Sequence, residues 1–242
     1  MLHGIDISNW QKDLKLKNVF PSIDFVICKA TEGLTFVDKY CDSWIQEAIK
    51  LDLLWGFYHF AKNNDPEKEA VFFYDNCKNY FGHGIPVLDI ESSSIKSWGT
   101  YAQIFTDKVH AMSGVYPIVY TSAAYLNRFA RTTVPRNCGL WLAGYPTNDI
   151  EKFQPEKKLP YPISPWNIIA MWQFTSKGRI EGYDNMLDLD YAYMDSAAWK
   201  KYAVCDITDN SDRVSGDTKP IPQVSETHKF EDDKMSVTIT MK

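Results

Sequence analysis

Two carboxylates, Asp89 and Glu91, stand one residue apart at the end of a short apolar run in this chain. An apolar run that stops at turn residues, here the serines at 92–94, is typical of a buried strand. Because side chains alternate along a strand, both carboxylates should lie on one face, with their Cα atoms about 6.5 Å apart. Each charge raises the pKa of the other, so one acid can stay protonated near neutral pH. The pair is therefore suited to acid catalysis on a glycosidic bond, although two acids at a strand end can also simply face solvent.

The elements that position this pair follow from apolar runs and amphipathic segments over residues 1–203. Strands alternate with helices in the first half and with loops in the second, which predicts an α/β fold on a parallel sheet. A strand number of about eight favours an irregular β/α barrel of the TIM type, with an open doubly wound sheet as the alternative. No glycine-rich loop follows a strand, which disfavours a nucleotide site. Strands are expected near residues 4–8, 25–30, 53–60, 85–91, 116–122, 140–145, 168–174 and 186–191, helices near 44–49, 66–77, 101–112 and 197–202, and a long loop over 146–166.

Further carboxylates stand at the ends of other expected strands. Asp6 belongs to the first strand and Asp188 to the eighth, and these two strands become neighbours when a barrel closes. The carboxyl ends of barrel strands meet at one face, so Asp6 and Asp188 should converge with Asp89 and Glu91. Asp190 faces the same way as Asp188 by strand alternation, so a role for it stays open.

Aromatic side chains flank the same strand ends. The apolar faces of sugar rings stack on aromatic side chains, and sugar hydroxyls bind carboxylates and amides, so an acidic groove with aromatic walls predicts a glycan substrate. About half of these aromatics are expected to belong to the core instead. The set comprises Trp10, Tyr58, Phe60, Tyr120, Trp141 and Trp172.

Composition narrows the class of protein. The net charge of −5 and the pI near 5.5 disfavour a nucleic-acid binder, which is more usually basic. The five cysteines are odd in number, irregularly spaced and without a CxxC pair, which favours buried thiols made in a reducing compartment over a disulfide framework or a zinc site. No run of apolar residues is long enough for stable membrane insertion, and the histidines share no spacing typical of a metal site. We expect neither a cofactor nor a metal.

Eight short segments of the chain resemble, in the same order, the motifs of the glycoside hydrolase family 25 muramidases, the lysozymes common among bacteriophage endolysins. Each segment alone is weak, but together they are specific, and they cover about residues 2–200. They read DISNWQ at 6–11, KATEG at 29–33, GFYHF at 56–60, DIE at 89–91, VYTS at 119–122, LWLA at 140–143, WQFTS at 172–176 and LDLD at 187–190.

The resemblance implies a flattened, irregular β/α barrel. It also implies hydrolysis of the β-1,4 bond between N-acetylmuramic acid and N-acetylglucosamine in bacterial peptidoglycan. By position, Glu91 would be the general acid/base, with Asp89, Asp6 and Asp188 as its acidic partners. An acid two residues before the proton donor is similar to the arrangement of substrate-assisted chitinase-type enzymes, which favours retention of configuration with Asp89 as stabiliser. Asp190 departs from the family pattern, which usually has Asn there.

The resemblance also assigns the walls of the groove. Lys29 is expected inside the barrel, where pairing with an acid is its simplest role, and His59 is expected to be a hydrogen-bonded structural residue. The expected substrate-binding residues are Tyr58, Tyr120, Trp141, Gln173, Trp10 and Lys29.

Two alternatives remain open at this stage. One is a catalytically silent protein that binds cell-wall glycan on the same fold, although a binding module need not keep clustered acids. The other is a metal-dependent phosphodiesterase that uses the carboxylates as ligands.

The C-terminal part of the chain differs from the rest. Residues 1–203 are expected to form the catalytic domain, and the polar composition of 204–242 predicts a linker or tail, disordered or opening a wall-binding module. Residues 237–241 alternate like a strand. Because the first strand begins near Gly4, we expect synthesis without a signal peptide in the host cytoplasm and action on the wall after release.

Overall fold

The computed structural model describes residues 1–155 and 157–204. The strand expected at 237–241 and nearly all of the expected tail lie outside the described residues, so the domain boundary near 203 stays a prediction. Among the residues described, no helix is long and apolar enough to cross a membrane.

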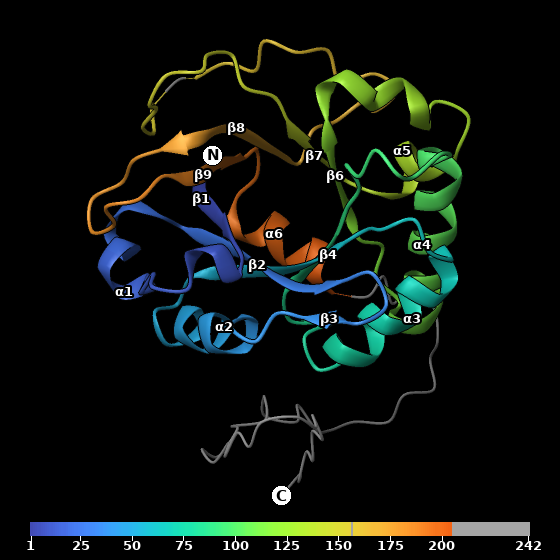
Figure 1. Ribbon diagram of the computed structural model, residues 1–242. Coiled ribbons are helices and arrows are strands. Elements are labelled where there is room, and N and C mark those ends of the chain that lie inside the picture. Colours follow the sequence, from blue (N-terminus) through green and yellow to red (C-terminus); the bar gives the residue numbers. More distant parts are fainter. Residues whose placement is uncertain (156, 205–242) are drawn as a thin grey trace, which may run out of the picture. The chain divides into compact units, whose positions relative to one another are not determined.

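Eight strands close into a barrel, as the sequence predicts, and the open-sheet alternative is wrong (Figure 1). Closure occurs because β1 (Leu2–Ile7) pairs with β2 (Phe25–Glu32) on one side and with β9 (Leu187–Ala192) on the other. The short strand β3 (Phe36–Val37) adds to the outer end of β2. The remaining strands are β4 (Leu54–Phe60), β5 (Ile85–Asp89), β6 (Ile118–Ser122), β7 (Leu140–Ala143) and β8 (Met171–Gly178).

One strand of the barrel runs against the others. The pairs from β1 through β2, β4, β5, β6, β7 and β8 are parallel, but β9 is antiparallel to both β8 and β1. A wholly parallel sheet was expected, and the difference arises because β8 and β9 form a hairpin rather than a strand–helix–strand unit. The start of β9, not its end, therefore lies at the face where the other strands end.

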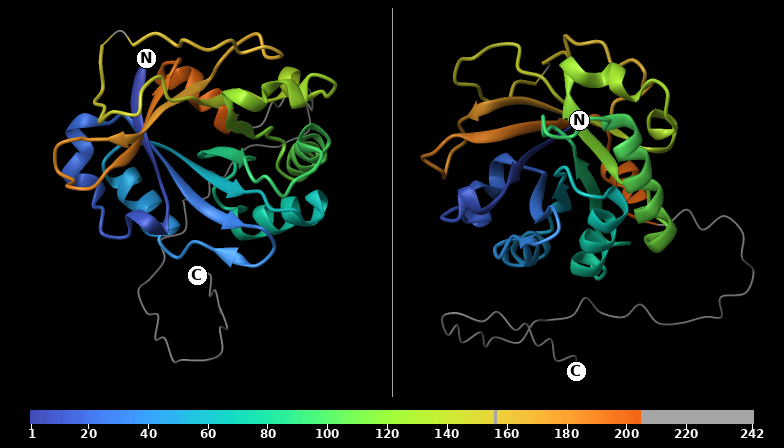
Figure 2. Two further views of the ribbon diagram at one scale, coloured as in Figure 1. Left: turned by 45° about the horizontal axis from the view of Figure 1, so that its top comes forward. Right: turned by 45° about the vertical axis from the view of Figure 1, so that its right-hand side comes forward.

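Helices cover one side of the barrel and a long loop covers the other (Figure 2). Local signals set the helix ends: the Asp65 side chain accepts the N–H groups of Glu67 and Lys68 at the start of α3, and Gly114 takes a left-handed conformation (φ 75°) after α4. The helices are α1 (Leu16–Val19), α2 (Cys41–Lys50), α3 (Pro66–Cys77), α4 (Trp98–Ser113), α5 (Val134–Asn137) and α6 (Ser196–Ala203), with 3₁₀ turns η1 (Asn9–Gln11), η2 (Phe20–Ser22) and η3 (Ala123–Phe129).

The long loop between β7 and β8 packs on the strands that lack covering helices. Its Phe153 stacks on His3 of β1, with ring centroids 4.5 Å apart, and the backbone N–H of Gln154 donates to the Tyr191 hydroxyl of β9. The loop thus takes the place of a helix in the second half of the chain.

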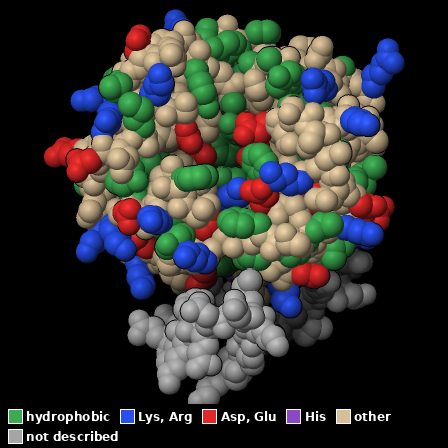
Figure 3. All heavy atoms as spheres, in the orientation of Figure 1, with side chains coloured by type: hydrophobic (Ala, Val, Ile, Leu, Met, Phe, Trp, Pro, Cys, Tyr) green, Lys and Arg blue, Asp and Glu red, His purple; other side chains and the backbone are tan. Residues whose placement is uncertain are grey.

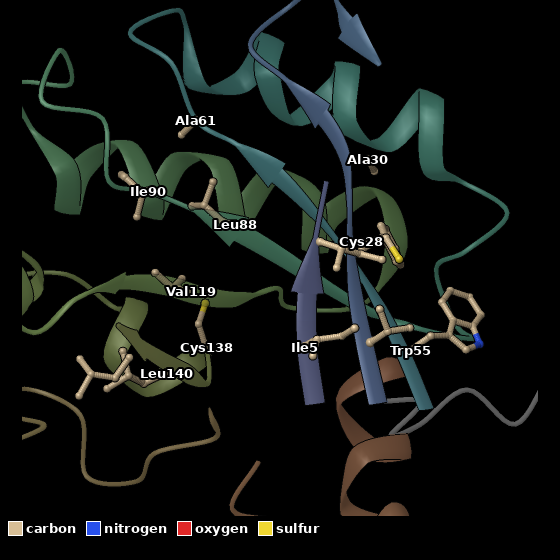
Figure 4. Close-up of a cluster of buried hydrophobic side chains, with 14 of the residues drawn as sticks. Ile5, Cys28, Ala30, Trp55, Ala61, Leu88, Ile90, Val119, Cys138 and Leu140 are labelled. Atoms are coloured by element: carbon tan, nitrogen blue, oxygen red, sulfur yellow. The ribbon is translucent and has the colours of Figure 1, made fainter. Parts of the chain in front are cut away.

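Buried apolar side chains form two layers, one between the strands and the helices and one inside the barrel. Figure 4 shows part of the outer layer, where Ile5, Cys28 and Leu88 come from three different strands. In the inner layer, Phe25 at the start of β2 packs on Trp199 of α6, with ring centroids 4.8 Å apart. Helix α6 therefore closes the end of the barrel at which the parallel strands begin.

Several expected strands have different bounds in the structure, including those at 116–122, 140–145, 168–174 and 85–91. The run expected at 168–174 starts at Met171 and continues to Gly178, because residues beyond Phe174 pair with β9 in the hairpin. Ile168 belongs instead to the loop and is 74% exposed. The strand expected at 85–91 ends at Asp89, so Glu91 lies just beyond it.

Candidate active site

Polar and aromatic side chains replace apolar ones where the inner face of the barrel reaches the carboxyl ends of its parallel strands. On β2, the inward alternation runs from Phe25 through Ile27 to Lys29, and on β5 it runs from Val87 to Asp89. These ends surround a cavity of about 380 Å³. Figure 3 shows acidic side chains gathered around a hollow near the middle of this face. The cavity is lined by every site residue expected from the sequence, namely Asp6, Trp10, Lys29, Tyr58, Asp89, Glu91, Tyr120, Trp141, Gln173 and Asp188.

A chain of hydrogen bonds fixes Asp6 on one wall of the cavity. The hydroxyls of Tyr120 and Tyr145 both donate to Oε1 of Gln173. This leaves the Gln173 amide nitrogen to donate to Oδ2 of Asp6, at 2.6 Å. Burial raises the pKa of Asp6 to about 6, and the hydrogen bond from Gln173 offsets part of that effect.

Asp190 lies below Asp6 inside the barrel and is completely buried. Its Oδ1 accepts the indole N–H of Trp141 at 2.9 Å. Burial raises the pKa of Asp190 well above its usual range, and the charges of Asp6 and Asp188 raise it further. Strand alternation correctly predicts that Asp190 faces the same way as Asp188.

Asp188 reaches the cavity because β9 is reversed. It is the second residue of β9 and pairs with Asp6 of β1. The expected position of Asp188 at the carboxyl end of a parallel strand is wrong in strand direction, yet the side chain converges with the other acids as expected. Burial raises the pKa of Asp188 to about 8, and the charges of Asp6 and Glu91 add to this effect.

Asp89 and Glu91 both line the cavity, at different depths. Asp89 is buried, and its Oδ1 has no hydrogen-bond partner among the described residues. Burial raises the pKa of Asp89 well above its usual range, and the charges of Glu91 and Asp6 raise it further. Glu91 is exposed at the mouth, yet burial of its carboxyl by the walls still raises its pKa.

The two acids of this pair do not raise each other's pKa symmetrically, as the sequence argument assumed. The charge of Glu91 acts on Asp89, whereas the pKa of Glu91 is raised by burial and lowered by Lys29.

Lys29 brings a positive charge into the acidic cavity. Its ammonium pairs with Glu32, and Lys62 pairs with the other oxygen of Glu32 from the surface, at 2.8 Å. The Lys29 ammonium also lies 4.9 Å from the ring centre of Phe60. The expected pairing of Lys29 with an acid is present, and its charge lowers the pKa of both Asp89 and Glu91.

The aromatic side chains divide between the cavity and the core. Trp10 is 84% exposed at the mouth and offers an open ring face. Tyr120 and Trp141 line the cavity but are nearly buried, and their polar groups bind Gln173 and Asp190. Trp172 faces the outer layer, where its indole donates to the backbone oxygen of Gly144, so it belongs to the core.

His59 lies outside the cavity. It is completely buried between the hydroxyl of Thr31 and the carboxylate of Glu69, each 2.8 Å from a ring nitrogen. Burial lowers the pKa of His59, although Glu69 opposes this effect. The hydrogen-bonded structural environment expected from the sequence is the one observed.

Tyr145 and Ser176 are cavity residues that the sequence argument missed. Tyr145 stands beyond the end of β7, and alternation along the expected strand at 140–145 is the signal that could have found it, because Tyr145 shares the face of Trp141. Ser176 lies in the part of β8 that extends past the expected strand. In the described ranges, no group of three or more His, Cys, Asp or Glu side chains is arranged to hold a metal ion.

The chain matches the family model of glycosyl hydrolases family 25 over residues 5–183. It is 30% identical over 201 residues to an N,O-diacetylmuramidase of Arthroderma benhamiae, covering 75% of this chain and 80% of that protein. It is 28% identical over 196 residues to the autolytic lysozyme of Clostridium acetobutylicum, covering 78% of this chain but only 55% of that protein's length.

The solved structures agree with this relationship. The family GH25 lysozyme of Aspergillus fumigatus aligns with a TM-score of 0.63 at 27% sequence identity, over 84% of this chain and 98% of that one. Three findings agree: the family model covers residues 5–183, the Arthroderma benhamiae relative is matched over most of its length, and the barrel is shared. This chain belongs to glycosyl hydrolases family 25.

Proposed function

We propose that this protein is an N-acetylmuramidase, or lysozyme, that hydrolyses the β-1,4 bond between N-acetylmuramic acid and N-acetylglucosamine in bacterial peptidoglycan. The observation that carries the proposal is the convergence of Asp6, Asp89, Glu91 and Asp188 in one open cavity of a family 25 barrel. Relatives named lysozyme and N,O-diacetylmuramidase support the substrate class.

Glu91 is the proposed general acid/base. It stands at the mouth of the cavity, where a glycan strand can reach it, and burial of its carboxyl raises its pKa toward the range useful for proton donation. In the first step, the Glu91 carboxyl gives its proton to the glycosidic oxygen as the bond to the anomeric carbon breaks. In the second step, the carboxylate takes a proton from the attacking water.

Asp89 is the proposed partner in a substrate-assisted reaction. The acetamido oxygen of the muramic acid attacks its own anomeric carbon, and the acetamido nitrogen becomes positive as that bond forms. Asp89 lines the cavity and keeps a small exposed fraction, so a substrate N–H can donate to its carboxylate. This route gives retention of configuration, because two displacements occur at the same carbon.

The remaining expected residues would bind and orient the sugars. Trp10 supplies an exposed ring at the mouth, and the half-buried ring of Tyr58 lies in the wall. Asp6 and Asp188 would accept sugar hydroxyls or hold the nucleophilic water.

A silent glycan-binding protein is the second candidate, but nothing specific favours it over catalysis. The raised pKa values of Asp6, Asp89, Glu91 and Asp188 mean that burying these acids destabilises the fold at neutral pH. A purely binding role would not require such a set. The phosphodiesterase alternative lacks a suitable group of metal ligands among the described residues.

We also propose that the enzyme is of the endolysin type and meets the wall after release from a reducing cytoplasm. The described cysteines Cys28, Cys41, Cys77 and Cys138 are buried free thiols, which is compatible with that compartment. Fractionation of producing cells before and after membrane permeabilisation is the check. Wall digestion before permeabilisation would contradict this proposal.

The product of digestion tests the proposed bond specificity. Purified peptidoglycan is digested, the new reducing ends are reduced with borohydride, and the products are identified by mass spectrometry. Reduced muramic acid at the new ends is expected. Reduced glucosamine would mark a glucosaminidase, and no new reducing ends would leave only the binding function.

A further inference from the structure

Asp190 is a buried acid for which the proposed reaction has no use. It lies on β9 inside the barrel, opposite Gly4 of β1 and Gln173 of β8. Its carboxyl has no access to solvent, so a substrate cannot reach it. A group in such a position acts only through its neighbours.

The hydrogen bonds around Asp190 are compatible with a proton on its Oδ2. Oδ1 accepts the indole N–H of Trp141, whereas Oδ2 is buried and accepts no hydrogen bond from the described residues. Asp6 and Asp190 each act on the pKa of the other, so the two carboxyls are neighbours inside the barrel. Two ionised carboxylates are both acceptors, so a hydrogen bond between them would require a hydrogen on one of them.

Asp6 is the acceptor of the two. Its Oδ2 already accepts the Gln173 amide, whose orientation is fixed by two phenols that donate to Oε1. Asp190 has the unpartnered oxygen and the deeper position, and a buried carboxyl without a cation keeps its proton.

The charged groups that act on Asp190 have the same sign. They are Asp6 from β1 and Asp188 from its own strand. The charge of Asp190 in turn raises the pKa of Tyr145, which follows β7. No cation of the described residues contributes to its environment. Like charges and burial both favour the neutral acid.

We propose that Asp190 is held protonated and donates a hydrogen bond from Oδ2 to Asp6, so that it is a positioning residue for the ionised Asp6. The proton stays on Asp190 through the reaction, and no bond to it is made or broken. This positioning role rests on the proposed function, whereas the protonation of Asp190 can be measured without substrate.

The test follows the titration of Asp6 by NMR in protein labelled with ¹³C at the aspartate carboxyls, in the wild type, D190N and D190A. An amide reproduces both hydrogen bonds of a neutral carboxyl, because its oxygen accepts from Trp141 and its N–H donates to Asp6. D190N should therefore leave the pKa of Asp6 nearly in place. D190A removes the donor, so it should raise the pKa of Asp6.

An ionised Asp190 would change the pKa of Asp6 in the opposite direction. If Asp190 is ionised, its removal relieves a repulsion, and D190N lowers the pKa of Asp6, which would overturn the proposal. The Asp190 carboxyl resonance of the wild type is identified as the one that is absent from D190N. At neutral pH it should have the chemical shift of a protonated carboxyl.

Activity provides the second readout. D190N should keep most of the wild-type kcat for wall digestion, while D190A should lose about 10-fold to 100-fold in kcat through misplacement of Asp6. A 100-fold loss in folded D190N would contradict the positioning role even if the NMR result holds. If D190A does not fold, D190N alone still decides between a neutral and an ionised Asp190.

Discussion

Gln173 turns its amide nitrogen, not its oxygen, toward Asp6, with 2.6 Å between Nε2 and Oδ2. Two hydrogen bonds fix this orientation, because the amide oxygen already accepts the hydroxyls of Tyr120 and Tyr145. Three strands and the loop after β7 thus meet at one amide. The arrangement favours the ionised form of Asp6 in a site where burial works against it.

Replacement of Gln173 by Glu should shift the acidic limb of the pH–activity profile to higher pH. The new side chain has the same shape but cannot donate to Asp6 unless it is protonated, so the pKa of Asp6 should rise above about 6. The profile of kcat/KM for wall digestion is the measurement. Tyr145→Phe is the matched control, because it removes one phenol but leaves the bond between Gln173 and Asp6. An acidic limb that stays in place in Gln173→Glu would contradict this role of Gln173.

Replacement of Lys29 by Met should move the alkaline limb of the same profile to higher pH. The change keeps the apolar stem and removes the charge that lowers the pKa of Glu91, so Glu91 would keep its proton to higher pH. Lys62→Met is the control, because Lys62 pairs with the same Glu32 from the surface. Equal shifts in both variants would show that the effect is not local to Lys29.

Replacement of Asp188 by Asn should stabilise the protein, and more so at higher pH. The native pKa of about 8 lies above the ordinary value of 3.8, so the native state binds this proton more tightly than the unfolded state does. The free energy of unfolding therefore falls as pH rises between these values, and the variant removes that fall.

Thermal melting of Asp188→Asn at several pH values is the check. A gain in Tm of at least about 2 °C is expected at pH 8, since about 1 kcal/mol shifts a domain of this size by about 2–4 °C. The gain should vanish near pH 4. Asp184→Asn, at an exposed acid between β8 and β9, is the surface control. A gain that does not depend on pH would contradict the assigned cause.

Much of the site could be predicted from the sequence because strand alternation is a local rule. Asp89 and Lys29 each follow inward-facing apolar residues on their own strand, so their direction needs no tertiary information. The closing of β1 onto β9 brought Asp6 and Asp188 together as expected.

What could not be predicted depends on pairings between distant segments. The reversal of β9 follows from its hairpin with β8. The apolar residues at 168–170 made β8 appear to start before Met171. The hydrogen bond from Tyr145 to Gln173 joins two segments that are far apart in the sequence. The proximity of Asp190 and Asp6 needs the register of β1 on β9, which sequence spacing does not give.

The most direct test of the central claim is the rate of wall digestion by Glu91→Gln. The amide keeps the size of the side chain at the mouth of the cavity but has no proton to give to the glycosidic oxygen. With circular dichroism unchanged and a melting temperature no lower than that of the wild type, kcat/KM should fall by at least about 100-fold, the lower end of what general acid catalysis contributes. A folded Glu91→Gln protein that digests walls within a factor of a few of the wild-type rate would contradict the account.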